Sequence, residues 1–138
     1  MPDESNAARR WTPVAQSPEL PRPAGAYSPA VRAGDFVYVS GQVPKDPVTG
    51  AVDGDDLSGQ ARRVLDNLRR VLAAAGATLA DVVSVTVYLA DANDWGAFNA
   101  VYQEFFSAPF PSRTVVGCQL RGILVEISAV AYLGDRAR

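Results

Sequence analysis

The stretch Ile123-Leu124-Val125-Glu126-Ile127-Ser128-Ala129-Val130-Ala131 determines the fold, and Glu126 is the one ionisable side chain within it. Its β-branched and aliphatic residues predict a strand that is covered on both faces. An unpaired carboxylate in such a strand costs several kcal/mol. The sequence therefore predicts that another group compensates the charge of Glu126.

Arg113 is a candidate partner, in a strand that begins at Pro111-Ser112-Arg113-Thr114-Val115-Val116. Two interpretations of an Arg and a Glu that meet where strands pair remain open. One is a structural ion pair, and the other is a site for a small anionic substrate.

The composition is that of a single ordinary domain, with 138 residues, 48% hydrophobic residues and a net charge of -2. It carries no signature of nucleic-acid binding. No stretch approaches the roughly 18 consecutive apolar residues of a membrane helix, and the N-terminus lacks the layout of a signal peptide. The one cysteine, Cys118, fits a reducing compartment. We expect a cytoplasmic protein that binds neither nucleic acid nor membrane.

Missing residue types narrow the chemistry. The chain has no His, and Lys45 is its only lysine. This excludes the usual zinc ligand sets, the Ser-His-Asp arrangement and the Cys-His pair. Lys45 lies among turn residues rather than in the desolvated pocket that a Schiff-base lysine needs, and Gly50, Gly54 and Gly59 fit no phosphate-binding motif. We expect no metal and no cofactor, so carboxylates, hydroxyls and backbone groups must carry any catalysis.

The N-terminal third of the chain predicts an arm followed by strands. Residues 1–23 have no periodicity and predict an extended or mobile arm before a single domain over 24–138. Ala30 to Gln42 predicts two short strands around a Gly-Asp turn. The following polar loop contains Asp53, Asp55 and Asp56, which could bind a divalent cation. A solvated loop that leads into a helix is the favoured interpretation.

The spacing of apolar residues predicts two helices. The first covers Leu57 to Ala75, and its arginine-rich opposite face is interpreted as solvated. The second runs from about Ala92 to Ser107 and bears an aromatic stripe assigned to the core. The stripe consists of Trp95, Phe98, Val101, Tyr102 and Phe105. Between the helices, Val83, Val85, Val87 and Leu89 alternate with polar residues and predict a strand with one apolar face.

This order of elements predicts an α+β fold in which two helices pack on one side of a mixed sheet. Two helices cover only one face of a sheet of five or six strands, yet the stretch around Glu126 is apolar on both faces. A second copy of the chain is the economical cover for the other face. We therefore predict a homo-oligomer.

From about Ser17 to Leu133 the chain resembles the RidA (YjgF) family of enamine/imine deaminases. The matching stretches are Pro23-Ala24-Gly25-Ala26-Tyr27-Ser28, Val39-Ser40-Gly41-Gln42-Val43-Pro44, Leu65-Asp66-Asn67-Leu68, Asp91-Ala92-Asn93-Asp94-Trp95 with Asn99, Phe110-Pro111-Ser112-Arg113-Thr114 and Val125-Glu126-Ile127. The resemblance implies a chorismate-mutase-like α+β fold, assembled as a homotrimer with ligand clefts between neighbouring subunits. It also implies cofactor-free hydrolysis of 2-imino acids, formed from enamines such as 2-aminoacrylate, to 2-oxo acids and ammonia.

The resemblance also implies roles for individual residues. Arg113 matches the arginine that grips the substrate carboxylate, and Glu126 matches the glutamate thought to position the attacking water and handle its proton. Tyr27, Ser40 and Asn99 match polar residues that line the same cleft. Gly41 and Val115 complete the expected substrate-binding set, with Val115 acting through its main chain.

Three departures from the family pattern leave alternatives open. Val115 replaces a usual cysteine, the segment from Arg113 to Glu126 is about two residues shorter and contains Arg121-Gly122, and Gly25-Ala26-Tyr27 replaces a Gly-Pro-Tyr step. One alternative is a family member that acts on a larger imine, and another is a trimer that binds small ligands without turnover. Ribonuclease activity ranks last, because the chain has a pI near 5.0 and no His.

Overall fold

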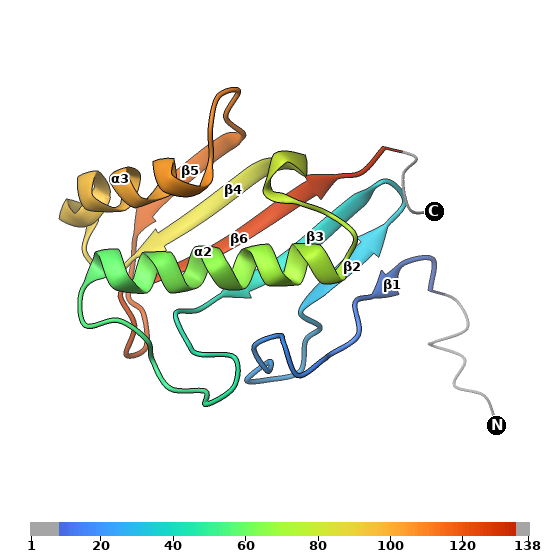
Figure 1. The fold of residues 1–138 in the computed structure, drawn as a ribbon, viewed down its shortest axis with the longest axis horizontal. Coiled ribbons are helices and arrows are strands. Elements are labelled where there is room, and N and C mark those ends of the chain that lie inside the picture. The colour runs from blue at the N-terminus through green and yellow to red at the C-terminus, as the bar shows by residue number, and fades with distance from the viewer. Residues whose placement is uncertain (1–8, 135–138) are drawn as a thin grey trace.

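The computed structural model describes residues 9–134, which form one mixed sheet and two α-helices (Figure 1). The strands are β1 (Thr12–Pro13), β2 (Ala30–Ala33), β3 (Phe36–Gln42), β4 (Val82–Leu89), β5 (Ser112–Gly117) and β6 (Val125–Tyr132). The helices are α2 (Leu57–Ala74) and α3 (Trp95–Phe105), and short 3-10 turns cover Leu79–Asp81 and Ala92–Asp94. From β2 to β6 the order of strands and α-helices matches the predicted one, and β1 is an additional short strand within the segment predicted to be an arm.

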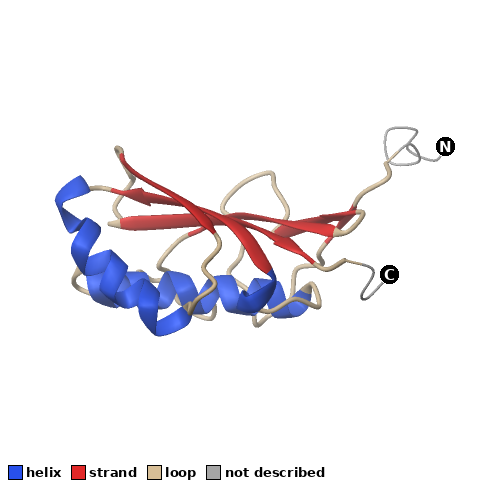
Figure 2. Ribbon diagram, turned by 90° about the horizontal axis from the view of Figure 1, so that it is seen from above, coloured by secondary structure: helices blue, strands red, loops and turns tan. Residues whose placement is uncertain are grey.

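The six strands lie in the order β1-β2-β3-β6-β4-β5. Strands β4 and β5 are parallel and are connected through α3, as a parallel pair requires, and all other neighbouring pairs are antiparallel. Both helices lie on the same side of the sheet (Figure 2). The predicted α+β architecture is therefore confirmed, with β6 inserted between β3 and β4.

Helix α2 forms where the apolar spacing predicts it. Asp56 caps its N-terminus by accepting a hydrogen bond from the Gly59 N–H at 2.8 Å. Gly76, at a φ of +79°, follows its C-terminus, where a left-handed residue ends many helices. The apolar stripe, which includes Val64, Leu68 and Leu72, is fully buried against the sheet.

In strand β4 the predicted alternation is wrong at Val83. Val83 was expected on the apolar face, but its side chain is 43% exposed, and Val82 is buried in its place. The pairing of β4 with β6 shifts register between Val82 and Ser84. A β-bulge inserts one residue and moves the side chains before it to the other face.

Helix α3 is shorter than predicted, because the segment Ala92–Asp94 adopts a 3-10 turn and α3 ends at Phe105. Phe98 and Tyr102 are buried in the core, as the stripe predicts. Trp95 is 48% exposed, so its assignment to the core is wrong. Its ring lies instead beside the guanidinium of Arg113.

The described part of the expected N-terminal arm runs along the edge of the sheet. Thr12 and Pro13 pair with Arg32 and Val31 of β2, and Leu20 is buried. Residues 1–8 lie outside the described residues. The division into an arm over 1–23 and a domain over 24–138 stays a prediction.

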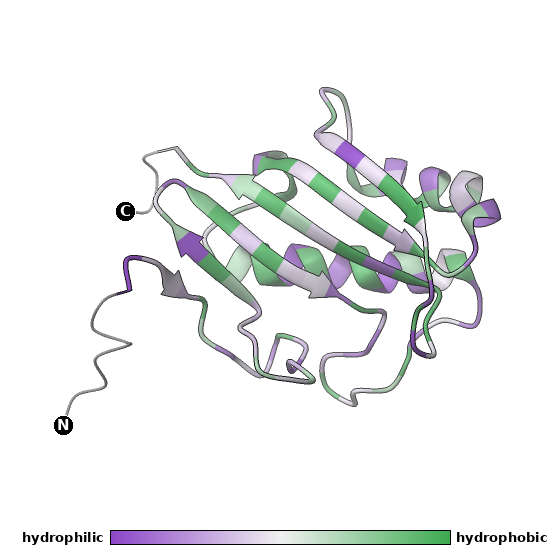
Figure 3. Ribbon diagram, turned by 180° about the vertical axis from the view of Figure 1, so that it is seen from behind, coloured by the Kyte–Doolittle hydropathy of each residue, from purple (hydrophilic) through white to green (hydrophobic). Residues whose placement is uncertain are grey.

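The sheet face opposite the helices has no cover within the described chain (Figure 3). Phe36, Tyr38 and Tyr132 are 38%, 47% and 46% exposed on β3 and β6. We call this surface the open face. Clustered exposed aromatic side chains are typical of surfaces that bind another protein, so the predicted homo-oligomer stays a prediction that this face favours. Between residues 9 and 134, no helix is long and apolar enough to cross a membrane.

Candidate functional site

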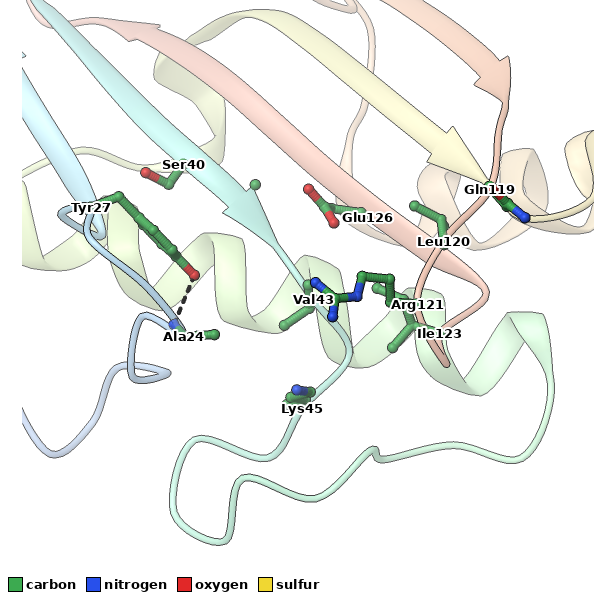
Figure 4. A pocket seen from close by; sticks show the side chains of 11 residues that line it. Ala24, Tyr27, Ser40, Val43, Lys45, Gln119, Leu120, Arg121, Ile123 and Glu126 are labelled. Atoms are coloured by element: carbon green, nitrogen blue, oxygen red, sulfur yellow. Dashed lines mark hydrogen bonds between the residues drawn. The ribbon is translucent and has the colours of Figure 1, made fainter.

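A cavity of about 910 Å³ opens beside β3 and β6 and contains Glu126 (Figure 4). It is lined by Ala24, Tyr27, Ser40, Gly41, Val43, Lys45, Gln119, Leu120, Arg121, Ile123 and Glu126. Four of the residues predicted for the site, Tyr27, Ser40, Gly41 and Glu126, lie together here. We call this hollow the Glu126 cavity.

Glu126 reaches the cavity because side chains alternate along β6. Its neighbours Val125 and Ile127 are fully buried on the helix side, so Glu126 faces the other way. Partial burial raises the pKa of the Glu126 carboxyl, since desolvation penalises the charged form. A carboxyl with a raised pKa beside open space is suited both to accept a proton and to return it.

Gly41 makes room for that carboxylate. A Cβ placed on Gly41 would overlap Glu126 Oε2 and lie 3.1 Å from Glu126 Cδ. The backbone of β3 therefore approaches the carboxylate more closely than any other residue type permits. The register shift between Val39 and Gln42 is the local irregularity at this point of the strand.

Two hydroxyl groups lie in the same cavity. Tyr27, on the loop before β2, accepts a hydrogen bond at its phenol oxygen from the Ala24 N–H at 3.0 Å, which leaves its own proton available (Figure 4). Ser40 donates its hydroxyl proton to Ser28 O at 2.6 Å, which leaves its oxygen available as an acceptor. The cavity thus offers one hydrogen-bond donor and one acceptor in addition to the carboxylate.

Lys45 and Arg121 line this cavity as well, although neither is among the site residues predicted from the sequence. Lys45 was set aside as a turn residue, and Arg121 was noted only as a change in a shortened loop. One signal could have found Arg121, because it is five residues from Glu126, whereas Arg113 is thirteen residues away. Sequence distance to Glu126 would therefore have favoured the arginine that lines the cavity.

Arg113 and Asn99 line a second cavity, of about 340 Å³, together with Tyr102. The Arg113 guanidinium carbon lies 4.6 Å from the ring centroid of Tyr102 and 5.3 Å from that of Trp95, which are cation–π distances. Burial raises the pKa of Tyr102 to about 12, although Arg113 acts in the opposite direction. The Tyr102 hydroxyl is buried and has no hydrogen-bond partner among the residues that the structure describes.

Arg113 and Glu126 lie on opposite faces of the sheet within one chain. Arg113 pairs with Val85 of β4, whose side chain is buried on the helix face. Glu126 pairs with Tyr88, three residues farther along β4, and side chains an odd number of residues apart on a strand point to opposite faces. Val115 pairs with the buried Val87 and so shares the face of Arg113. The structural ion pair considered from the sequence is therefore wrong, and no single-chain cleft unites all seven predicted residues.

The acidic loop before α2 has a structural role. Asp56 caps α2, and Asp53 pairs with Arg63 at 2.8 Å. Within residues 9–134, no group of three His, Cys, Asp or Glu side chains could hold a metal ion. What the Glu126 cavity offers is a proton-handling carboxyl, two hydroxyls and two cations, which suits the addition of water to a small polar substrate.

Comparisons with known proteins identify relatives of this chain in sequence and in fold. Residues 17–133 match the sequence model of the family described as Endoribonuclease L-PSP. The chain is 45% identical over 114 residues to a RutC family protein of Pyrococcus horikoshii, covering 81% of this chain and 90% of that one. It is 40% identical over 116 residues to a 2-iminobutanoate/2-iminopropanoate deaminase of Salmonella typhimurium, covering 80% and 90%. The crystal structure of RidA from a Psychrobacter species superposes with a TM-score of 0.81 at 35% identity, covering 85% and 96%.

Proposed function

We propose, from the premise that this chain belongs to the endoribonuclease L-PSP family, which includes RidA, that it hydrolyses reactive 2-imino acids to 2-oxo acids and ammonia. The observation that carries the proposal is the placement of Glu126 against Gly41 in an open cavity, with its pKa raised by burial. Imine hydrolysis requires one group that takes a proton from water and later returns it to nitrogen. Glu126 has the charge and position for that task.

The proposed reaction consumes one water and releases one ammonia. The water oxygen bonds to the imine carbon while one water proton passes to Glu126. Glu126 returns this proton to the imine nitrogen, which becomes an amino group on a tetrahedral carbon. The hydroxyl on that carbon then gives up its proton, which reaches the same nitrogen through Glu126, and the carbon–nitrogen bond breaks to leave a carbonyl and ammonia. Both protons of the water therefore end on the nitrogen. Tyr27 as donor and Ser40 as acceptor orient the water and the nitrogen.

The substrate carboxylate needs a donor beside Glu126, and we assign this role to Arg113 of a neighbouring copy in a homotrimer. Two features support the assignment. Strand β5 is the terminal strand of the sheet, so Arg113 lies at an edge that can approach another copy. The open face that carries Glu126 presents aromatic side chains that another copy would cover. Asn99 and Val115 would accompany Arg113 from that copy.

This activity suits a protein that removes damaging imines formed from enamines such as 2-aminoacrylate. The test is release of 2-oxobutanoate from 2-iminobutanoate that a threonine dehydratase generates in the assay. We expect Glu126→Gln to lower kcat/KM by about a hundredfold or more, the usual weight of a positioned general acid or base. Glu104→Gln, on the helix layer and paired with Arg62, is the matched control. A Glu126→Gln variant with the same kcat/KM as wild type would contradict the proposed function.

A second candidate function is binding of small carboxylates without turnover. It is favoured by one observation, namely that Arg113 of the same chain is on the other face and only Lys45 and Arg121 supply cations to the Glu126 cavity. Stabilisation of the protein by 2-oxobutanoate, combined with no acceleration of imine hydrolysis, would support this candidate over the enzyme.

A further inference from the structure

We infer that Lys45 and Arg121 bind a second acidic group of the substrate, so that the protein prefers dicarboxylic 2-imino acids over simple alkyl ones. This inference rests on the proposed function of the Glu126 cavity. It concerns the choice of substrate rather than the chemistry, and it starts from the charges that line the cavity.

The charges in the cavity favour an anion. Among the eleven lining residues, Glu126 is the only acidic one, while Lys45 and Arg121 are cationic. Neither cation makes a side-chain hydrogen bond or an ion pair with any residue between 9 and 134. By contrast, the four arginines of α2 all have carboxylate partners: Arg62 pairs with Glu104, Arg63 with Asp53, and Arg69 and Arg70 with Asp66.

A buried side-chain amide on α2 holds the backbone around Lys45 in place. Asn67 of α2 is fully buried, and its Nδ2 donates hydrogen bonds to Val43 O at 3.0 Å and Lys45 O at 2.8 Å. A buried side-chain amide that bonds to backbone carbonyls holds a loop in one conformation. Lys45 therefore emerges at a defined point of the cavity rim.

The loop that carries Arg121 is fixed at both ends. The Cys118 N–H donates to Leu89 O at 2.8 Å, and the Ala90 N–H donates to Leu124 O at 3.0 Å. The Leu124 N–H in turn donates to Oε1 of Gln60, a side chain that is 6% exposed on α2. Arg121 thus stands at the tip of a short clamped loop, and Figure 4 shows its side chain extending over Val43 on the rim of the Glu126 cavity.

A guanidinium and an ammonium on fixed loops recognise a carboxylate well, because the first offers a planar pair of donors and the second a compact charge. An alkyl imino acid has nothing to place against them. A dicarboxylic imino acid can present its reacting centre to Glu126, its first carboxylate to Arg113 of the neighbouring copy, and its second carboxylate to this rim. Charge pairing of this kind discriminates between substrates of similar size.

The test compares 2-iminoglutarate, generated by a glutamate oxidase, with 2-iminobutanoate on the full-length protein. The measured quantity is the ratio of kcat/KM for the two imines. We expect wild type to favour 2-iminoglutarate, and Arg121→Gln to lower the ratio by about tenfold, the effect of losing one hydrogen bond to a charged group. Lys45→Gln should lower it in the same direction. Arg62→Gln, which removes an arginine of the helix layer, should leave the ratio unchanged.

A binding measurement separates this inference from the proposed function. The increase in Tm produced by 2-oxoglutarate and by 2-oxobutanoate is measured for wild type and for Arg121→Gln. If wild type hydrolyses neither imine but 2-oxoglutarate stabilises it more, and Arg121→Gln removes that excess, the inference stands and the deaminase proposal falls. The inference is overturned if wild type shows no preference for the dicarboxylate in either measurement, or if Arg121→Gln leaves the preference intact.

Discussion

Arg113 and Glu126 stand on opposite faces of one sheet, separated by β4, which pairs with both of their strands. A substrate held by both residues therefore needs two copies of the chain. The proposed catalysis therefore depends on assembly, because the Glu126 cavity of one copy must lie against the β5 edge of another.

The open face should be the surface through which copies associate. Tyr38 is 47% exposed at its centre on β3. We expect Tyr38→Glu to shift the protein from trimer to monomer, because association would bury an unpaired carboxylate, and that burial costs several kcal/mol. Size-exclusion chromatography with light scattering measures the change. Ala73→Glu, on the exposed side of α2, is the control, and an unaltered trimer in the Tyr38 variant would contradict the prediction.

Gly41 should be essential for the position of the carboxylate. We expect Gly41→Ala to displace Glu126 and to lower kcat/KM for 2-iminobutanoate by roughly a hundredfold, since a displacement of about 1 Å in a catalytic group has that effect. The unfolding temperature should change little, because the added methyl group meets a movable side chain. Equal rates for the variant and wild type would show that the contact with Gly41 does not position Glu126.

The raised pKa of Glu126 predicts two pH profiles. Because the ionised carboxylate accepts the water proton, kcat/KM should fall as the pH decreases through the raised pKa, above the ordinary value of 4.5. For stability the sign is opposite. The protonated folded form is favoured, so the contribution of Glu126 is fully present below pH 4.5 and is lost as the pH rises through the folded pKa.

Glu126→Gln should therefore have a higher Tm than wild type at pH 8, and the difference should close below pH 4.5. Thermal unfolding across this range measures it. A difference that widens toward acid would mean that the pKa of Glu126 is lowered rather than raised.

The cap of α2 should contribute measurably to stability. Asp56→Ala removes the acceptor for the Gly59 N–H and should lower the free energy of unfolding by about 1 kcal/mol. Asp55→Ala, one residue earlier and exposed, is the control and should change it by no more than about 0.5 kcal/mol. Denaturant unfolding distinguishes the two, and equal effects of the substitutions would argue against capping by Asp56.

The sequence was sufficient for the bounds of α2 and for the general architecture, whereas α3 is shorter than its pattern predicts. The apolar spacing of α2 and the capping signals at its ends specify it locally, so its bounds agree to within a residue. The bulge in β4 could not be predicted from the sequence, because the alternation of Val83 and Val85 is regular. The irregularity lies in the pairing of β4 with β6, where the register shifts. Local patterns identify elements, but they do not reveal irregular pairing between them.

The site was predictable only in part for the same reason. Glu126 lies in a stretch that is apolar on both sides, and the strand of Arg113 is short and mixes polar with apolar residues, so periodicity does not reveal which face each side chain takes. The face is decided by the insertion of β6 between β3 and β4, which depends on long-range pairing. The roles of Lys45 and Arg121 were missed because only the folded chain brings their two loops to one cavity.

The measurement that tests the central claim most directly is a mixing experiment. Arg113→Ala and Glu126→Gln variants are co-refolded in equal amounts, and imine hydrolysis is compared with that of each variant alone. If each site combines Arg113 of one copy with Glu126 of another, about one quarter of the sites regain both residues, and about one quarter of wild-type activity should return. Mixed oligomers, verified by native mass spectrometry, that are no more active than the separate variants would contradict the account.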